Sequence, residues 1–250
     1  MKNEIILWLS SILLVFLIGY IKNVTDKDYP ITGTFGIEGK KVSYKLDKVS
    51  FDKTSYKNII ISDVKGVSGT LIRIEDNEQK ETAFKEIDGG LECEIPKLKP
   101  GKKTHYKVVL NYADKIFEIP QNDFVTLTFW GNIPSPVKIL HFILLYGGLL
   151  MSIRSLLELF KKHKNLKRYA IVACTLFITL SAIISPLRNS YKLGAINNYV
   201  PQVTDLLQPA LLLILLIWIL GTILIFNKKY MRTVTIFVAV VTVVLFFFIR

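Results

Sequence analysis

The chain has 250 residues, of which 51% are hydrophobic, and its mean hydropathy of +0.39 is too high for an ordinary soluble domain. A formal net charge of +12 would be typical of a nucleic-acid-binding protein. The charges, however, are unevenly divided. Residues 22–135 carry 18 basic and 17 acidic residues, whereas residues 136–250 carry 13 basic and 2 acidic ones. Most of these later bases flank apolar runs, so the excess indicates membrane topology and argues against a nucleic-acid partner.

The first apolar run, residues 5–21, has no charged residue and is long enough to cross the hydrocarbon core of a bilayer. A cleaved signal peptide is the alternative interpretation. The apolar core is longer than is usual for a signal peptide, and no small-x-small cleavage site follows it. We therefore expect an uncleaved transmembrane anchor over residues 1–22.

Residues 23–134 are expected to form an all-β domain. Val42, Tyr44 and Leu46 alternate with polar residues, as do the apolar residues of 106–112, and this period of two predicts half-buried strands. Further strand-like runs are 57–62, 67–75, 90–96, 115–119 and 124–130. Turn residues separate them, and seven or eight short strands in this length favour an immunoglobulin-like sandwich.

The two cysteines, Cys93 and Cys174, fall in different parts of the chain and cannot pair with each other. Cys93 shares the apolar face of its strand with Leu91 and Ile95, which predicts a buried core thiol. No cysteine pair has metal-ligand spacing, and His105, His141 and His163 are too far apart in topology for a metal cluster. We expect neither a metal nor a cofactor.

Residues 135–250 are expected to form a four-helix transmembrane domain, with spans near 137–160, 169–187, 206–227 and 233–249. The loop 161–168 carries five bases and no acid, and the loop 228–232 carries three bases. The positive-inside rule places both loops in the cytoplasm. Five spans in all then put the N-terminus inside, and residues 22–135 and the C-terminus outside, in the inner or plasma membrane.

Two charged residues, Arg154 and Glu158, interrupt the second span. They are one helical turn apart with the base preceding the acid, which is the weaker order for such a pair. Burying a charge costs about 2.5–3.5 kcal/mol on insertion scales. Arg154 therefore needs a partner beyond its own helix, such as another span, a lipid headgroup or a partner subunit. A structural clamp between helices and a ligand or partner site both remain open.

A second group of candidates lies at the outer side. His141 is near the outer end of the second span and heads a polar stripe with Gly148, Ser152 and Ser155, which also suits helix packing. The loop 188–205 adds Arg188, Tyr191, Lys192, Tyr199 and Asp205, followed by Gln208. These side chains are candidates for a ligand or partner site, with loop packing and aromatic anchoring as the alternative.

Two resemblances accompany these patterns. The stretch 98-LKPGKKTHYKVVL-110 resembles the Leu-x-Pro-Gly and Tyr-x-Val signature of fibronectin type III domains, with Tyr106 two residues later than usual. The stretch 134–160, with His141, Arg154 and Glu158, together with the later Gly194 and Asp205, is similar to a family of uncharacterised bacterial membrane proteins. That resemblance implies a leading span, an extracytoplasmic β domain and a helical bundle. It implies no reaction.

The sequence thus predicts an integral membrane binding or assembly module of the cell envelope. Its β domain would recognise a protein or a glycan, and its helices would contact lipid and partner subunits. Catalysis is not expected, because the sequence has no nucleophile–base or metal-binding motif. The alternative is a small-solute or lipid transporter component, or a membrane-embedded enzyme, that uses His141 and the outer loop or the Arg154–Glu158 pair.

Overall fold

In the computed structural model, the described residues are 2–37, 40–51, 55–62, 66–75, 78–112, 115–121, 123–161, 165–196, 198–227 and 230–249. Parts of both basic loops, including His163, lie outside them. The chain divides into two compact units. We call residues 1–26, 133–191 and 195–250 the helical unit, and residues 27–132 and 192–194 the β unit. The sequence places its boundaries a few residues away, at 22–23 and 134–135.

The helical unit contains seven α-helices and one π-helical segment among its described residues. They are α1 (Lys2–Thr25), α2 (Ser135–Glu158), α3 (Leu166–Thr179), the π-helical η1 (Leu180–Ile184), α4 (Ser185–Lys192), α5 (Val203–Leu206), α6 (Pro209–Ile225) and α7 (Met231–Phe246). Three of the described helical stretches are long and apolar enough to cross a membrane: residues 4–25, 135–158 and 166–192. The apolar helices α6 and α7 are shorter.

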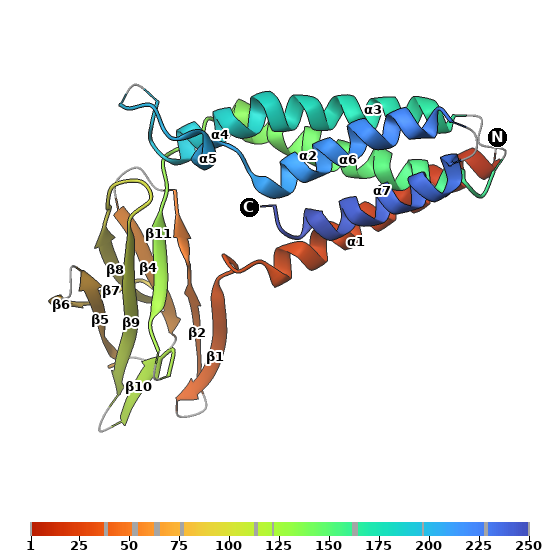
Figure 1. Ribbon diagram of the computed structural model, residues 1–250. Coiled ribbons are helices and arrows are strands. Elements are labelled where there is room, and N and C mark those ends of the chain that lie inside the picture. Colours follow the sequence, from red (N-terminus) through yellow and green to blue (C-terminus); the bar gives the residue numbers. More distant parts are fainter. Residues whose placement is uncertain are drawn as a thin grey trace. The chain divides into compact units, whose positions relative to one another are not determined.

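The long helices run alongside one another (Figure 1). The N-terminal ends of α1, α3 and α7 lie at the same end of the bundle as the C-terminal ends of α2 and α6 (Figure 1). Proline occupies the first turn of α2 and of α6, where a missing N–H costs no helical hydrogen bond. This arrangement brings sequence-distant helix ends together, which matters for the charged residues described below.

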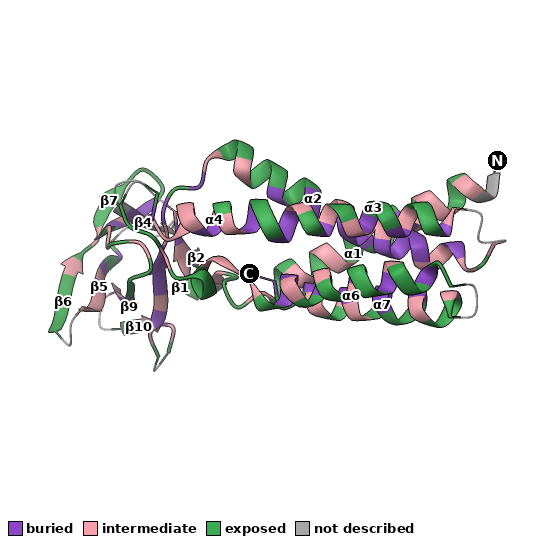
Figure 2. Cartoon of the chain, turned by 45° about the horizontal axis from the view of Figure 1, so that its top comes forward, coloured by how far each residue is buried: buried purple, intermediate pink, exposed green. Residues whose placement is uncertain are grey.

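Apolar side chains of α2, α3, α6 and α7 form the core of the helical unit. Phe177 and Trp218 stack with ring centroids 6.2 Å apart, and the Trp218 indole N–H donates to the Thr242 hydroxyl over 2.9 Å. Buried residues line the inward faces of the helices, and exposed residues cover their outward faces (Figure 2). Many exposed side chains are large and apolar, such as Leu13 and Phe16 of α1, as expected of a surface that faces lipid.

Glycine lets α2 approach α3 closely. A Cβ at Gly148 would lie 2.7 Å from the Phe177 ring, whereas a Cβ at the adjacent Gly147 would lie 3.6 Å from Leu176. The first distance is a clash and the second is an ordinary contact. Phe177 cannot move aside easily because Trp218 packs against it.

We therefore expect Gly148→Ala to lower the stability of the helical unit by about 1–3 kcal/mol, the usual cost of overpacking a core. Gly147→Ala is the matched control. It should be neutral or raise stability by up to about 1 kcal/mol, because alanine is the better helix former. Thermal unfolding of the purified full-length protein in detergent measures both. Equal effects of the two substitutions would contradict the packing argument.

The β unit has eleven strands among its described residues. They are β1 (Ile31–Ile37), β2 (Lys40–Leu46), β3 (Val49–Ser50), β4 (Ser55–Ser62), β5 (Ser68–Glu75), β6 (Glu78–Ala83), β7 (Lys85–Ile87), β8 (Gly90–Pro96), β9 (Lys103–Tyr112), β10 (Lys115–Ile119) and β11 (Val125–Phe129). One sheet has the order β1-β2-β4-β8-β7, and the other has the order β3-β11-β9-β5-β6. β10 pairs with β9 beside this path. All pairings are antiparallel except that of β3 with β11.

Both sheets contribute to one hydrophobic core. Val42 and Leu46 of β2 and Tyr106, Val108 and Leu110 of β9 are fully buried, so the period-two patterns correctly identify the inward faces of these strands. Cys93 is 3% exposed, which confirms the predicted core thiol. His105, between buried neighbours on β9, is exposed as expected.

The predicted number of strands was too low. The strands β1, β3, β6 and β7 were missed. β6 and β7 carry almost only exposed side chains, so they show no alternation of apolar and polar residues. β1 contains two glycines, which resemble turn signals. All four missed strands lie at the edges of their sheets, where each pairs with a single neighbouring strand.

A short segment after α4 also belongs to the β unit. The backbone N–H of Gly131 donates to the Lys192 carbonyl over 2.7 Å, and the Lys192 ammonium lies 4.3 Å from the Trp130 ring centroid. Gly194 has a φ of +67°, and a Cβ there would lie 2.7 Å from Pro100. Glycine is therefore required at residue 194 both by its backbone conformation and by the close approach of Pro100.

Candidate functional site

Arg154 is the centre of a buried polar cluster in the helical unit. Its side chain is 0% exposed although it lies on α2 between apolar turns. One guanidinium nitrogen donates to Glu158 Oε2 over 2.7 Å, which is the pair expected from their four-residue spacing. Glu158 is itself 1% exposed, so both charges have been removed from solvent.

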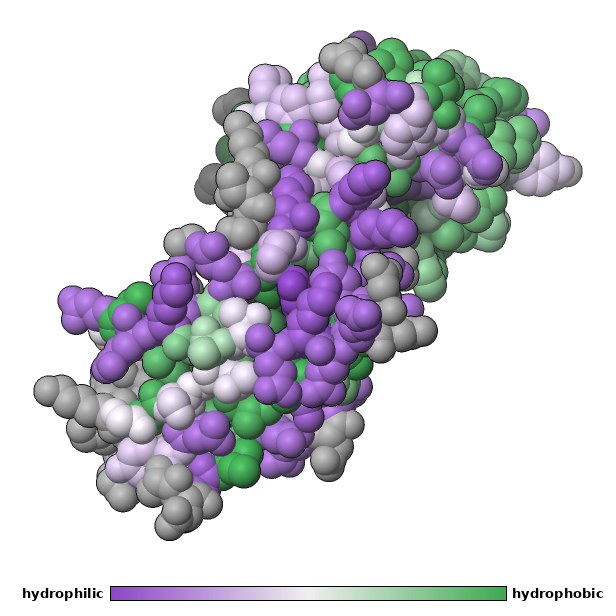
Figure 3. Space-filling view, turned by 90° about the vertical axis from the view of Figure 1, so that its left-hand side faces the viewer, coloured by the Kyte–Doolittle hydropathy of each residue, from purple (hydrophilic) through white to green (hydrophobic). Residues whose placement is uncertain are grey.

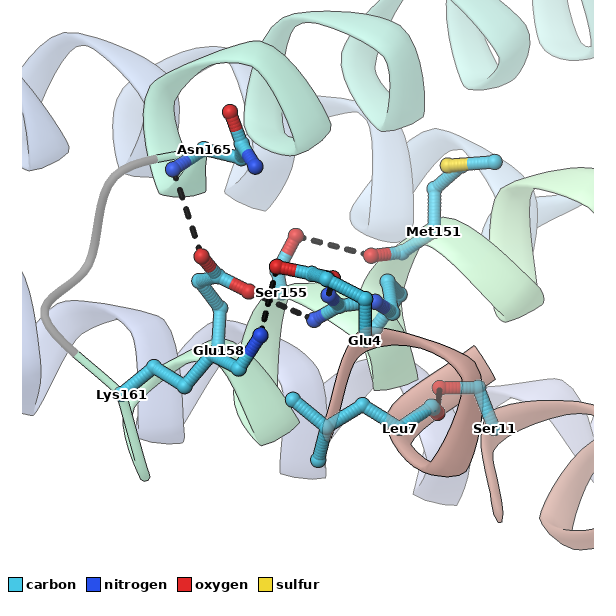
Figure 4. A network of polar contacts seen from close by, with 9 residues as sticks. Glu4, Leu7, Ser11, Met151, Ser155, Glu158, Lys161 and Asn165 are labelled. Atoms are coloured by element: carbon cyan, nitrogen blue, oxygen red, sulfur yellow. Dashed lines mark hydrogen bonds and ion pairs between the residues drawn. The ribbon is translucent and has the colours of Figure 1, made fainter. Parts of the chain in front are cut away.

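A second carboxylate reaches Arg154 from another helix. Glu4, in the first turn of α1, accepts from the other terminal guanidinium nitrogen over 2.6 Å. The Glu4 side chain also forms an ion pair with Lys161, which follows α2. In Figure 4, Glu4 and Lys161 approach each other beside Glu158 at the end of α2. One arginine thus bridges two carboxylates from two helices, a geometry suited to its fixed fork of N–H donors.

Two aromatic rings complete the surroundings of Arg154. The guanidinium carbon lies 4.6 Å from the ring centroid of Tyr169 on α3 and 5.4 Å from that of Trp8 on α1. These distances are typical of cation–π contacts, which gain strength when the cation is desolvated. The two rings also meet edge to face, with centroids 5.8 Å apart. Arg154 is therefore held by side chains of α1, α2 and α3 together.

The cluster is electrically balanced. Arg154 and Lys161 supply two positive charges, and Glu4 and Glu158 supply two negative charges. Glu158 Oε1 also accepts the backbone N–H of Asn165 over 3.3 Å, next to the start of α3. Only the Arg154 Nε, among the nitrogens of this guanidinium, has no hydrogen-bond partner in the described part of the chain. Such an arrangement is suited to holding three helices at fixed positions.

His141 lies on α2, 13 residues before Arg154 in the sequence. Its side chain is buried, and its Nε2 has no hydrogen-bond partner among the described residues. The positive charge of Arg188 on α4 is close enough to act on the imidazole. Ser185, also on α4, is buried with its hydroxyl unpaired within the same described residues. Ser185 and Arg188 directly follow the π-helical segment η1, a type of distortion often found near functional sites.

The other candidates from the outer loop are less buried. Tyr191 is partly buried, and Tyr199 and Asp205 are exposed. Lys192 contacts Trp130 within the β unit. The neighbouring Asn189 donates its amide to the Leu206 carbonyl over 2.8 Å, which ties α4 to α5. Of the loop residues predicted to meet His141, the structure thus relates Arg188 to it most directly.

The β unit contains a buried group of its own. Tyr106 donates its hydroxyl to the Asp47 carbonyl over 2.9 Å, and Tyr56 donates to the Asp47 carboxylate over 3.3 Å. The Asp47 backbone N–H donates to the Tyr56 hydroxyl over 3.1 Å. Burial raises the pKa of Tyr56 to about 12. Burial likewise raises the pKa of the Cys93 thiol, so this cysteine is suited to packing and not to nucleophilic chemistry.

The sequence interpretation missed Glu4, Trp8 and Tyr169. Glu4 stands just before the first apolar run and resembles an ordinary flanking charge. A signal was nevertheless available, because the expected topology places residue 4 at the same membrane face as the end of the second span. An acid there is at the right depth to meet Arg154.

Among the described residues, no group of three or more histidine, cysteine or acidic side chains could hold a metal ion. Comparison with protein-family models, with curated proteins and with solved structures finds no match for this chain.

Proposed function

We propose that this protein is an integral membrane binding and assembly module of the bacterial cell envelope. Its helical unit anchors it in the inner membrane, and its β unit recognises a protein or a glycan outside the cytoplasm. The carrying observation is the closed charge cluster around Arg154. Its four charges balance one another within the chain, so the costliest polar residues of the span act as a clamp between α1, α2 and α3.

The helical unit crosses the membrane five times in this proposal. The helices α6 and α7 have 17 and 16 residues, near the lower limit of about 17 for a span. The alternation of helix ends in the bundle supports one crossing by each of α1, α2, the continuous α3–α4 stretch, α6 and α7 (Figure 1). The N-terminus is then cytoplasmic, and the β unit and the C-terminus are outside.

The β unit is an immunoglobulin-like sandwich in this proposal. Its order β2-β4-β8-β7 corresponds to the A-B-E-D sheet of that architecture, and its order β11-β9-β5-β6 corresponds to strands G-F-C-C′. β1 is an additional strand outside this scheme. The resemblance to bacterial proteins with a leading span, an outer β domain and a helical bundle has the same order of parts. Such sandwiches commonly act by surface recognition.

Topology is tested with a reporter that is active only outside the cytoplasm. We expect activity for fusions after Gly131, Asn197 or Arg250, and none for fusions after Lys164 or Lys229, because the basic loops stay inside. All but the first of these positions lie outside the described residues. Activity after Lys164 would contradict the orientation.

Purification of the full chain should also recover stoichiometric partner proteins, whereas a lone monomer with bound lipid or solute would contradict the assembly role.

A second candidate function is a small-solute or lipid transporter component, or a membrane-embedded enzyme. The observation that favours it is the pair of buried polar atoms, His141 Nε2 and Ser185 Oγ, without partners among the described residues, together with the nearby charge of Arg188. An anionic ligand would suit these groups. His141→Phe should then produce the same cellular phenotype as deletion of the gene, while partner proteins are still recovered with the purified variant.

A further inference from the structure

A hollow of about 260 Å³ lies within the β unit between two of its edge strands. Thr34 and Phe35 of β1, Tyr44 of β2 and the continuous run of residues 116–121 line it. β1 is the last strand of its sheet, and β10 pairs only with β9 among the described strands. We call this hollow the edge groove.

The continuous lining shows that the edge groove follows a strand backbone. Successive side chains of a strand point to opposite faces, so a pocket on one face would be lined by every second residue. Here residues of both parities, from Ile116 to Gln121, border the hollow. Along the open sides of β10 and β1, backbone N–H and C=O groups have no neighbouring strand among the described residues. Such an edge is complementary to the backbone of an extended peptide.

The walls of the edge groove are aromatic. Phe35 and Phe117 stack with centroids 5.2 Å apart and an interplanar angle of 25°. The Tyr44 ring lies across Gly33, where any Cβ would collide with the tyrosine hydroxyl. An aromatic ring over a strand glycine is a known way to stabilise such an edge. This arrangement also places the Tyr44 ring, which belongs to β2, over β1, the strand that borders the edge groove.

Ile116 of β10 is an unusual edge residue. It is 70% exposed, although natural edge strands are commonly protected by charged residues or proline. The next acidic side chain, Glu118, is already paired with Lys107 over 3.0 Å. The β unit otherwise presents mostly hydrophilic residues with scattered apolar ones on the face in Figure 3. The groove therefore offers apolar contact along a free backbone edge, with little net charge.

We propose that the edge groove binds an extended peptide segment of another protein by strand addition. The segment pairs with the free edge of β10 and directs an apolar side chain toward Phe35, Tyr44 and Phe117. A glycan fits less well, because sugar rings stack on open aromatic faces, and Phe35 and Phe117 cover each other. This inference rests on the proposed function, since it names the partner class of the β unit.

The test uses the full-length protein in lipid nanodiscs and a displayed library of short random peptides. A synthetic copy of the most enriched peptide is the probe, and its dissociation constant is measured. We expect Ile116→Asp to weaken binding about tenfold or more, as for a central interface residue. Ile87→Asp is the matched control, because Ile87 is also an exposed isoleucine on an edge strand, β7, and should bind like the wild type.

A second probe separates strand addition from side-chain binding. N-methylation of alternate backbone nitrogens of the peptide should abolish binding when it blocks the nitrogens that face β10. Several results would overturn the proposal: no enriched peptide, unchanged affinity after either N-methylation pattern, or unchanged affinity of Ile116→Asp. An oligosaccharide that binds the groove, or self-association through Ile116, would also overturn it. None of these results would contradict the proposed membrane module. That proposal is contradicted instead if the reporter fusions place the β unit in the cytoplasm.

Discussion

Replacing Arg154 with leucine should destabilise the helical unit by about 3–5 kcal/mol, the usual cost of breaking a buried ion pair on one side. The substitution leaves Glu158 at 1% exposure without its cationic partner, while Glu4 keeps Lys161. Insertion into the membrane should be unaffected, because a costly charge has been removed from the span. Thermal unfolding of the purified protein measures the loss of stability, and alkaline extraction of membranes measures insertion.

The pairing of charges makes a specific rescue possible. Arg154→Leu combined with Glu158→Leu removes one charge of each sign and leaves the Glu4–Lys161 pair balanced. Stability should return to within about 1 kcal/mol of the wild type, since apolar replacement of both members is often neutral. Partner recovery should not return if Arg154 positions α1 and α3 for assembly. Glu158→Gln should resemble Arg154→Leu.

Arg154→Lys tests the geometry separately. Lysine keeps the charge but cannot donate from two fixed nitrogens to carboxylates on two helices, so we expect an intermediate loss of stability. Arg232→Leu is the matched control, because Arg232 is an exposed arginine at the start of α7. A wild-type unfolding temperature and wild-type partner recovery in Arg154→Leu would show that Arg154 is no clamp.

The β unit should lose about 2–3 kcal/mol of stability as the pH rises from 10 to 12. The pKa of Tyr56 is about 12 in the folded protein because burial disfavours the phenolate, whereas its ordinary value is 10.0. A pKa raised by folding contributes stability that is fully present below pH 10. That contribution is lost as the pH rises toward 12, because the unfolded chain releases the Tyr56 proton first.

Tyr56→Phe should flatten this part of the pH dependence. At neutral pH the variant should be less stable by about 1 kcal/mol, since the hydrogen bonds of the hydroxyl to Asp47 are lost. Tyr29→Phe is the control, because Tyr29 is an exposed tyrosine of the same unit and should keep the wild-type slope. A similar slope in Tyr56→Phe and wild type would rule out Tyr56 as the cause.

The stability of the β unit can be measured through the reactivity of Cys93. Its thiol is 3% exposed in the folded β unit, so a methanethiosulfonate reagent should modify it only after unfolding. The reaction is followed across a urea titration of the full chain in a Cys174→Ser background. This reports on the β unit even while the helices stay folded in detergent.

Local sequence patterns determined the elements whose own residues carry the signal. Long uncharged runs predicted helices at α1, α3, α6 and α7, because each run alone supplies the apolar surface a buried or lipid-exposed helix needs. Alternation predicted β2 and β9, because Val42, Leu46, Val108 and Leu110 face one core. β6 has no such signal. Its exposed polar side chains form a strand only because β5 supplies hydrogen-bonding partners.

The candidate site divides in the same way. Spacing along one helix was sufficient to pair Arg154 with Glu158, because residues four apart share a helical face. The second carboxylate, Glu4, lies 150 residues away in sequence, and only the packing of α1 on α2 brings it within 2.6 Å. Trp8 and Tyr169 likewise meet Arg154 only after three helices have assembled. The sequence determined that a buried charge needed a partner. Which partner it found was decided by tertiary packing, because desolvation makes every buried charge depend on groups that local sequence does not specify.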